Sequence, residues 1–161
     1  MALTPSGAIS LGGINTALNR SATAAINMND AQVRFLANQI SGSVNMNAMR
    51  NKQSTVGTIT VGEIFLPKAS IFGYSDGFYQ GGSLSSNTFI GTTISSFYST
   101  DYDSSITVIN SNGTTSGTLR LSVLGSTYTL PTRSGEYFLA NAGSSIFLTR
   151  VNQTITFQFA T

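Results

Sequence analysis

A short motif that occurs three times near the beginning of the chain is the feature that most constrains its fold. Each copy has an aliphatic residue, a small polar residue and a second aliphatic residue, followed by Gly or Asn and a short run of helical character. The copies are 8–14, 25–31 and 43–49, and their first aliphatic residues lie 17 and 18 positions apart. Repeated units of this kind cannot bury their apolar side alone, so they share a core. We therefore expect residues 1–54 to form a small α+β module of short strands and short helices.

The aliphatic positions of the repeat are the candidate assembly residues. A module of about 54 residues is marginal on its own, so it is expected to lean on the rest of the chain or on another subunit. Some of these positions would then belong to the internal core, and others would anchor a partner. The candidate interface residues are Ile9, Leu11, Ile26, Met28, Val44 and Met46.

An arginine lies in the tail of each repeat, at Arg20, Arg34 and Arg50. The second repeat predicts a helix that starts after Asn29 and ends at residues 41–42, a Ser-Gly pair. Arginine in the last turn of a helix is an ordinary stop signal, which is the favoured interpretation. Contact with a neighbouring subunit is the alternative, and the sequence leaves it open.

The pattern changes to period-two alternation after residue 55. Strand candidates recur at the spacing of about 8–12 residues that is typical of all-β domains. Turns are predicted at 76–77, 112–113 and 125–126, each of which contains glycine. The predicted fold is mainly β, with the repeat module followed by an antiparallel β-sandwich-like domain over residues 55–161. The predicted strands are 58–61, 64–66, 70–74, 88–98, 105–110, 118–124, 127–130, 136–139, 145–149 and 154–159.

The chain contains no histidine and no cysteine. This composition excludes Ser-His-Asp and Cys-His nucleophilic sites as well as the usual zinc sites. A hydrolase that uses carboxylates is the least favoured alternative, because the few carboxylates show no paired placement in the sequence. We expect no enzyme activity and no cofactor. The carboxylates of the β region are Glu63, Asp76, Asp101, Asp103 and Glu136.

Asp101 and Asp103 come closest to a metal-ligand pair. Two carboxylates two positions apart can share a calcium ion, but here no glycine-bounded loop and no distant glutamate completes the pattern. An ordinary polar loop is therefore the favoured interpretation, and metal binding stays open.

The weakly charged composition points to association with other chains. Charged residues make up 9% of the sequence, against about 25% in typical soluble domains, and the net charge is +2. A surface with so little charge is poorly protected against association, which predicts a homo-oligomer or a larger assembly. The basic residues are too sparse for a nucleic-acid interface. No apolar stretch is long enough to span a membrane, and residues 1–6 do not resemble a secretory signal.

Aromatic residues gather in the middle of the chain, where they would serve as a sugar-stacking platform or as core and rim of the β domain. The second use is the commoner one, and carbohydrate binding is kept as an alternative. These residues are Phe72, Tyr74, Phe78, Tyr79, Phe97, Tyr98 and Tyr102.

Residues 7–11 and 24–34 resemble the N-terminal module of small virion proteins of tailed phages, including cyanophages. That module reads Ser-Gly-x-Ile-Ser-Leu, then a small helix, a second unit Ile-Ser-Leu-x-Asp-Ala-x-Val-Arg and a third, shorter unit. Residues 72–84 and 87–91 are similar to the β-rich C-terminal part of some of these proteins. The present chain departs from the pattern at Gly12-Gly13 and has Asn-Met in place of Ser-Leu in the later repeats, but the aliphatic alternation is kept.

The resemblance implies a structural component of the virion, associated with the tail, neck, baseplate or fibres. It implies other virion proteins as partners, synthesis in the cytoplasm of the host bacterium, and no catalytic residue. The alternative is a receptor- or glycan-binding adhesin of the phage tail, whose partner would be a host surface glycan.

Overall fold

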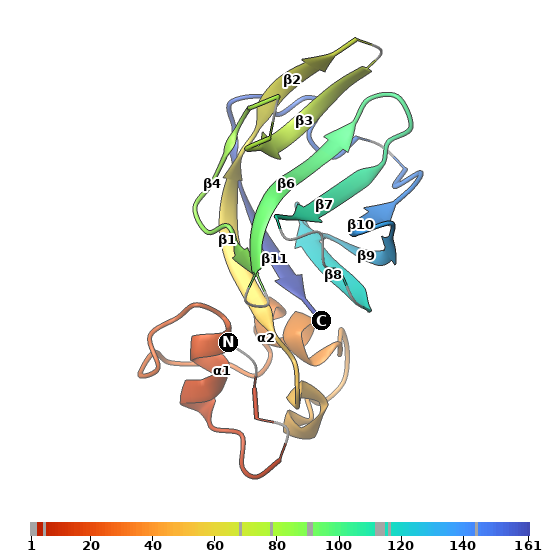
Figure 1. The fold of residues 1–161 in the computed structure, drawn as a ribbon. Helices are drawn as coiled ribbons and strands as arrows, with labels where there is room; N and C mark the ends of the chain where they lie inside the picture. Colours follow the sequence, from red (N-terminus) through yellow and green to blue (C-terminus); the bar gives the residue numbers. More distant parts are fainter. Residues whose placement is uncertain are drawn as a thin grey trace.

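The described part of the chain is mainly antiparallel β-structure with a small helical region at its N-terminal end (Figure 1). The mainly β, antiparallel prediction is thereby confirmed. The computed structural model describes residues 3–4, 6–67, 69–77, 79–89, 92–111, 115, 117–143 and 145–161.

Short helices precede all of the strands. They are α1 (Leu11–Ala17), α2 (Ala31–Ala37) and the 3-10 helix η1 (Met46–Met49). The strands follow in the order β1 (Ser54–Thr60), β2 (Gly62–Leu66), β3 (Ala69–Ser75), β4 (Ser83–Leu84), β5 (Thr88–Phe89), β6 (Thr92–Thr100), β7 (Ile106–Asn110), β8 (Thr118–Val123), β9 (Ser126–Arg133), β10 (Glu136–Leu139) and β11 (Thr154–Ala160).

The strands form one sheet that nearly closes on itself. Their order is β2-β3-β6-β7-β10-β9-β8-β11-β1-β4, and β5 pairs with β6 beside this path. Only Val61 separates β1, which pairs with β11, from β2, which pairs with β3. The path therefore returns to the stretch of chain where it started. One curled sheet takes the place of the two facing sheets that the predicted sandwich-like arrangement implies.

Two tight hairpins fix the register of the strands β8, β9 and β10. Leu124 and Gly125 connect β8 to β9 with φ of 52° and 77°, and Ser134 and Gly135 connect β9 to β10 with φ of 48° and 86°. Two central residues with positive φ match the right-handed twist of the flanking strands. The turn predicted at 125–126 is thus shifted by one residue, and the turn predicted at 112–113 lies outside the described residues.

The strand predicted at 145–149 is absent, and that segment consists of bends and a turn. Ile146 and Phe147 in it are buried and belong to the core of the sheet. The apolar residues that suggested a strand thus lie in a connecting segment. This segment covers one end of the sheet without pairing with a neighbouring strand.

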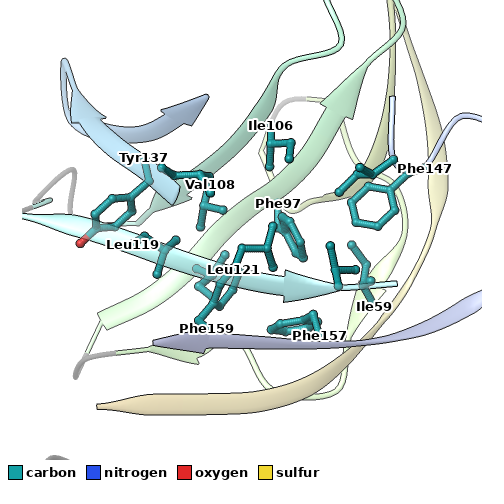
Figure 2. Packing of buried hydrophobic residues seen from close by; sticks show 14 of the residues in the cluster. Ile59, Phe97, Ile106, Val108, Leu119, Leu121, Tyr137, Phe147, Phe157 and Phe159 are labelled. Atoms are coloured by element: carbon teal, nitrogen blue, oxygen red, sulfur yellow. The ribbon is translucent and has the colours of Figure 1, made fainter. Parts of the chain in front are cut away.

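Phenylalanine rings dominate the core inside the sheet (Figure 2). The fully buried ring of Phe97 lies 5.3 Å from the centroids of Phe147 and Phe157 and 5.1 Å from that of Phe159. These pairs are close to edge-on, the arrangement that favours the aromatic quadrupole. Strands from opposite parts of the sheet path, β6 and β11, are held together by these contacts.

Candidate assembly surface

The polar middle residue of each repeat caps the turn that follows it. Ser10 Oγ accepts a hydrogen bond from the Gly13 N–H at 3.0 Å at the start of α1. The Asn27 and Asn45 Oδ1 atoms each accept the N–H two residues later at 2.9 Å. These side chains serve backbone donors that the helical turns leave unpaired. Within the described residues before position 53 no strand is present, so the predicted short strands, and with them the α+β module, are not confirmed.

The helix boundaries also differ from the predicted ones. Asp30, not Asn29, caps α2 through its bond from the Gln32 N–H at 2.8 Å. The helix ends at Asn38, whose left-handed φ of 56° stops it before the predicted Ser-Gly pair. Ile40 therefore lies beyond the helix and not on its apolar side.

The aliphatic positions of the repeat mostly face a second hydrophobic cluster. Five of the six candidate interface residues are partly buried against it, and Leu11 is the exception with 50% of its surface exposed. The repeat thus shares an internal core, and Leu11 is the candidate that faces outward. The cluster consists of Leu3, Ile14, Ala17, Leu18, Val33, Leu36, Ala37 and Met49, and the packed positions are Ile9, Ile26, Met28, Val44 and Met46.

Arg20 links the first repeat to the second. Its Nη2 atom lies 2.8 Å from Asp30 Oδ2 and also donates to Gln32. Burial raises the pKa of Asp30, but the bonds from Arg20 and from the N–H groups of Gln32 and Val33 outweigh it, so the pKa is lowered.

The other two repeat arginines make equivalent links. Arg34 Nη2 donates to the Gly42 carbonyl at 2.9 Å, on the approach to the third repeat. Arg50 Nη2 donates to the Gly7 carbonyl at 2.6 Å, just before the first repeat. The three arginines therefore tie the copies together in a closed circuit. Arg34 also lies in the last turn of α2, as the favoured interpretation predicts.

Arg120 on β8 attaches the helical region to the sheet. Its guanidinium donates to the carbonyls of Phe35 at 2.6 Å and Leu36 at 3.3 Å, in the last turn of α2, and lies 4.9 Å from the Phe35 ring centroid. A cation at this end of a helix also interacts favourably with the helix dipole. Gln158 on β11 makes a second link through its Nε2 atom, 3.2 Å from the Gln32 carbonyl.

An apolar hollow of about 250 Å³ lies beside this junction. The side chain of Ile40 at its rim is 86% exposed, the highest value among the large apolar side chains that the structure describes. An aliphatic side chain that exposed gains from coverage by another surface. The hollow is lined by Ala31, Arg34, Phe35, Ile40, Ser122, Gly125 and Thr127.

The Asp101 carboxylate binds a backbone N–H group of β3, and the Asp103 carboxylate binds one of its own loop. Asp101 Oδ1 accepts the Ser70 N–H at 3.2 Å, and Asp103 Oδ1 accepts the Ser105 N–H at 3.0 Å. The Thr100 hydroxyl bond to Asp103 is the main cause that lowers the pKa of that carboxyl. Among the described residues, no group of three or more His, Cys, Asp or Glu side chains could hold a metal ion. Asp101 thus attaches the loop to β3, and Asp103 fixes the turn within the loop.

The structure does not gather the mid-chain aromatic residues into one platform. Phe72 and Phe97 are buried in the core, while Tyr79 and Tyr102 are 44% and 85% exposed. These two tyrosines follow opposite ends of the ladder that pairs β3 with β6. Phe78 lies outside the described residues.

Comparisons with family models, curated proteins and solved structures found no match for this chain. Among the described residues, no helix has both the length and the apolar character needed to cross a membrane.

Sequence reasoning missed two residues of this surface. Arg120 lies in a strand of alternating pattern, where the sequence gives no sign that the residue reaches a helix far away in the chain. The predicted helix ends at residues 41–42 and so includes Ile40, whereas asparagine at position 38, a residue type that adopts left-handed φ, is a sequence signal of an earlier end.

Proposed function

We propose that this chain is a structural protein of a tailed-phage virion, in its tail, neck, baseplate or fibre region, and that it docks through its N-terminal repeat region. The observation that carries the proposal is the pair of exposed aliphatic side chains, Leu11 and Ile40, on a region that has its own hydrophobic cluster. Such a region is already folded, so binding does not have to order it, and exposed apolar anchors supply binding energy.

The resemblance of residues 7–52 to phage virion modules supports the assignment to a virion. The shared Ile-x-Leu form has a physical use in this chain: its outer positions, except Leu11, pack against the cluster and its middle position caps a turn. Docking by such a region requires no catalytic group.

The experiment is quantitative mass spectrometry of washed particles from a phage that encodes the chain, with immunogold labelling to locate it. The proposal expects a fixed copy number per particle and label at one part of the tail or neck. Complete loss of the protein during particle purification would refute it.

A further inference from the structure

The loop between β6 and β7 presents a tyrosine to solvent at the end of the sheet away from the helices (Figure 1). The Tyr102 side chain is 85% exposed, although tyrosine offers a large apolar ring for burial. Neighbouring Asp101 and Asp103 place negative charge on both sides of it.

The backbone on either side of Tyr102 is fixed. Asp101 and Ser70 exchange two hydrogen bonds, from the Asp101 N–H to the Ser70 carbonyl at 3.3 Å and from the Ser70 N–H to Asp101 Oδ1 at 3.2 Å. Asp103 accepts bonds from the Thr100 hydroxyl and the Ser105 N–H. Because the loop backbone is already fixed, it loses little further conformational freedom when the projecting ring binds a partner. Interface anchors share this property.

A pocket of about 390 Å³ lies between the β8–β9 turn and the segment before β11. Its volume is in the range of about 300–1,000 Å³ that accommodates ring-sized groups. Its apolar walls include Leu124 and Leu148, which are 42% and 45% exposed. The full lining is Leu124, Tyr128, Ser145, Ile146, Leu148, Thr149 and Arg150.

Arg150 gives this pocket a positive charge, and no carboxylate of the described residues forms an ion pair with it. The only side-chain bond that its guanidinium makes among them joins Nη1 to Gln153 Oε1 at 3.4 Å. The described residues contain one ion pair, between Arg20 and Asp30, so neither Arg150 nor Asp101 has a charged partner there. The pocket and the tyrosine loop therefore carry opposite charges.

The loop and the pocket are neighbours on one molecule. Ser99 Oγ lies 2.9 Å from Ser145 Oγ, which lines the pocket, and the Ala142 N–H donates to the Ser104 carbonyl at 3.0 Å. A projection and a complementary recess on adjacent segments suit a two-fold axis, because each copy then gives and receives the same contact.

We propose that two copies of this chain associate about a two-fold axis, with Tyr102 of each copy in the pocket of the other and Asp101 facing Arg150. The inference goes beyond the proposed docking and does not depend on it, since it rests on Asp101, Tyr102 and Arg150 and not on Leu11 or Ile40. Reciprocal contacts close at two copies, so this face forms a dimer.

Analytical ultracentrifugation of the purified full chain tests the dimer, at concentrations up to about 100 μM. The wild type is expected to dimerise, and Tyr102→Ala is expected to raise the dissociation constant at least about thirtyfold, as for an interface hot spot. The matched control is Phe65→Ala, which removes another exposed aromatic, 71% exposed on β2, and should leave the constant unchanged. A wild type that stays monomeric, or equal effects of the two variants, overturns the proposal.

Charge reversal tests the pairing of the two faces. Asp101→Arg and Arg150→Asp should each weaken the dimer about tenfold or more, and the double variant should recover most of the loss. Asp101→Asn keeps the acceptor for the Ser70 N–H and removes only the charge. A weaker dimer in this variant therefore shows the effect of the lost charge and not of a damaged loop. Folded single variants without recovery in the double variant overturn the pairing. The measurement needs no phage particle, so its failure is distinct from failure of the virion proposal.

Discussion

Replacement of Arg120 by alanine would test how the helical region is held on the sheet. The Arg120 guanidinium donates to the carbonyls of Phe35, Leu36 and Thr161 and to Asn38 Oδ1, at 2.6 to 3.3 Å. It also lies over the Phe35 ring. The substitution removes all of these contacts at once and leaves four oxygen acceptors without this donor.

The expected cost follows from the kind of contacts that are lost. A hydrogen bond to a charged group contributes about 1.5–3 kcal/mol, and a cation–π contact about 0.5–1 kcal/mol, but contacts of one side chain are not additive. Because water replaces part of the bonding at this half-buried site, we expect the free energy of unfolding to fall by about 3 kcal/mol. Arg120→Lys keeps the charge but lacks the planar set of donors of a guanidinium group. It should therefore lower the free energy of unfolding by about half as much.

Urea denaturation followed by circular dichroism measures these losses, and hydrogen exchange at the α2 amides shows where they arise. Arg133→Ala is the matched control, because exposed Arg133 stacks over Phe138 at 4.5 Å, and it should cost about 0.5 kcal/mol. If Arg120→Ala costs no more than Arg133→Ala, or leaves α2 exchange unchanged, the role assigned to Arg120 is wrong.

Three further predictions concern pH, backbone and core. The lowered pKa of Asp30 stabilises the fold at pH values above its ordinary pKa of 3.8, so this stability should be lost as pH falls from about 3.8 through the lower pKa of the folded state. Asp30→Asn should make acid unfolding less steep. In Gly73→Ala the new methyl would lie 2.3 Å from the Phe97 carbonyl, so urea denaturation should show a loss above about 3 kcal/mol. Gly125→Ala has open space and only an unfavourable φ, so it should cost about 1 kcal/mol. Phe97→Ala should cost about 3–5 kcal/mol by calorimetry, and a loss below about 1 kcal/mol would contradict its central place in the core.

The strands were predictable where the period-two pattern is backed by a local turn. The pattern at 118–130 marks β8 and β9 because glycine at the turn fixes the register within a few residues. The order of the strands was not predictable, because near-closure depends on a change of pairing partner at Val61, which has no local signature. The segment 145–149 has a strand-like pattern, but a buried loop that covers a sheet end presents the same apolar residues.

The candidate site was predictable in part. Sequence reasoning found the repeat and its aliphatic positions, because their spacing is local. It could not tell which position faces outward, since that depends on how three copies share one cluster. The arginine links and the Arg120 contacts join residues that are far apart in the chain or lie in different elements, so only the folded structure shows them.

Particle occupancy of the Leu11→Asp, Ile40→Asp double variant tests the central claim most directly. Both side chains are exposed, and an aspartate at the first residue of α1 is favourable at a helix N-terminus, so the variant should fold. Phe65→Asp is the control, with an exposed apolar side chain on the sheet. We predict that the copy number of the double variant in washed phage particles falls tenfold or more, which corresponds to a loss of about 1.4 kcal/mol of binding energy. The control should keep the wild-type copy number. Normal occupancy of the double variant would contradict docking through the N-terminal region.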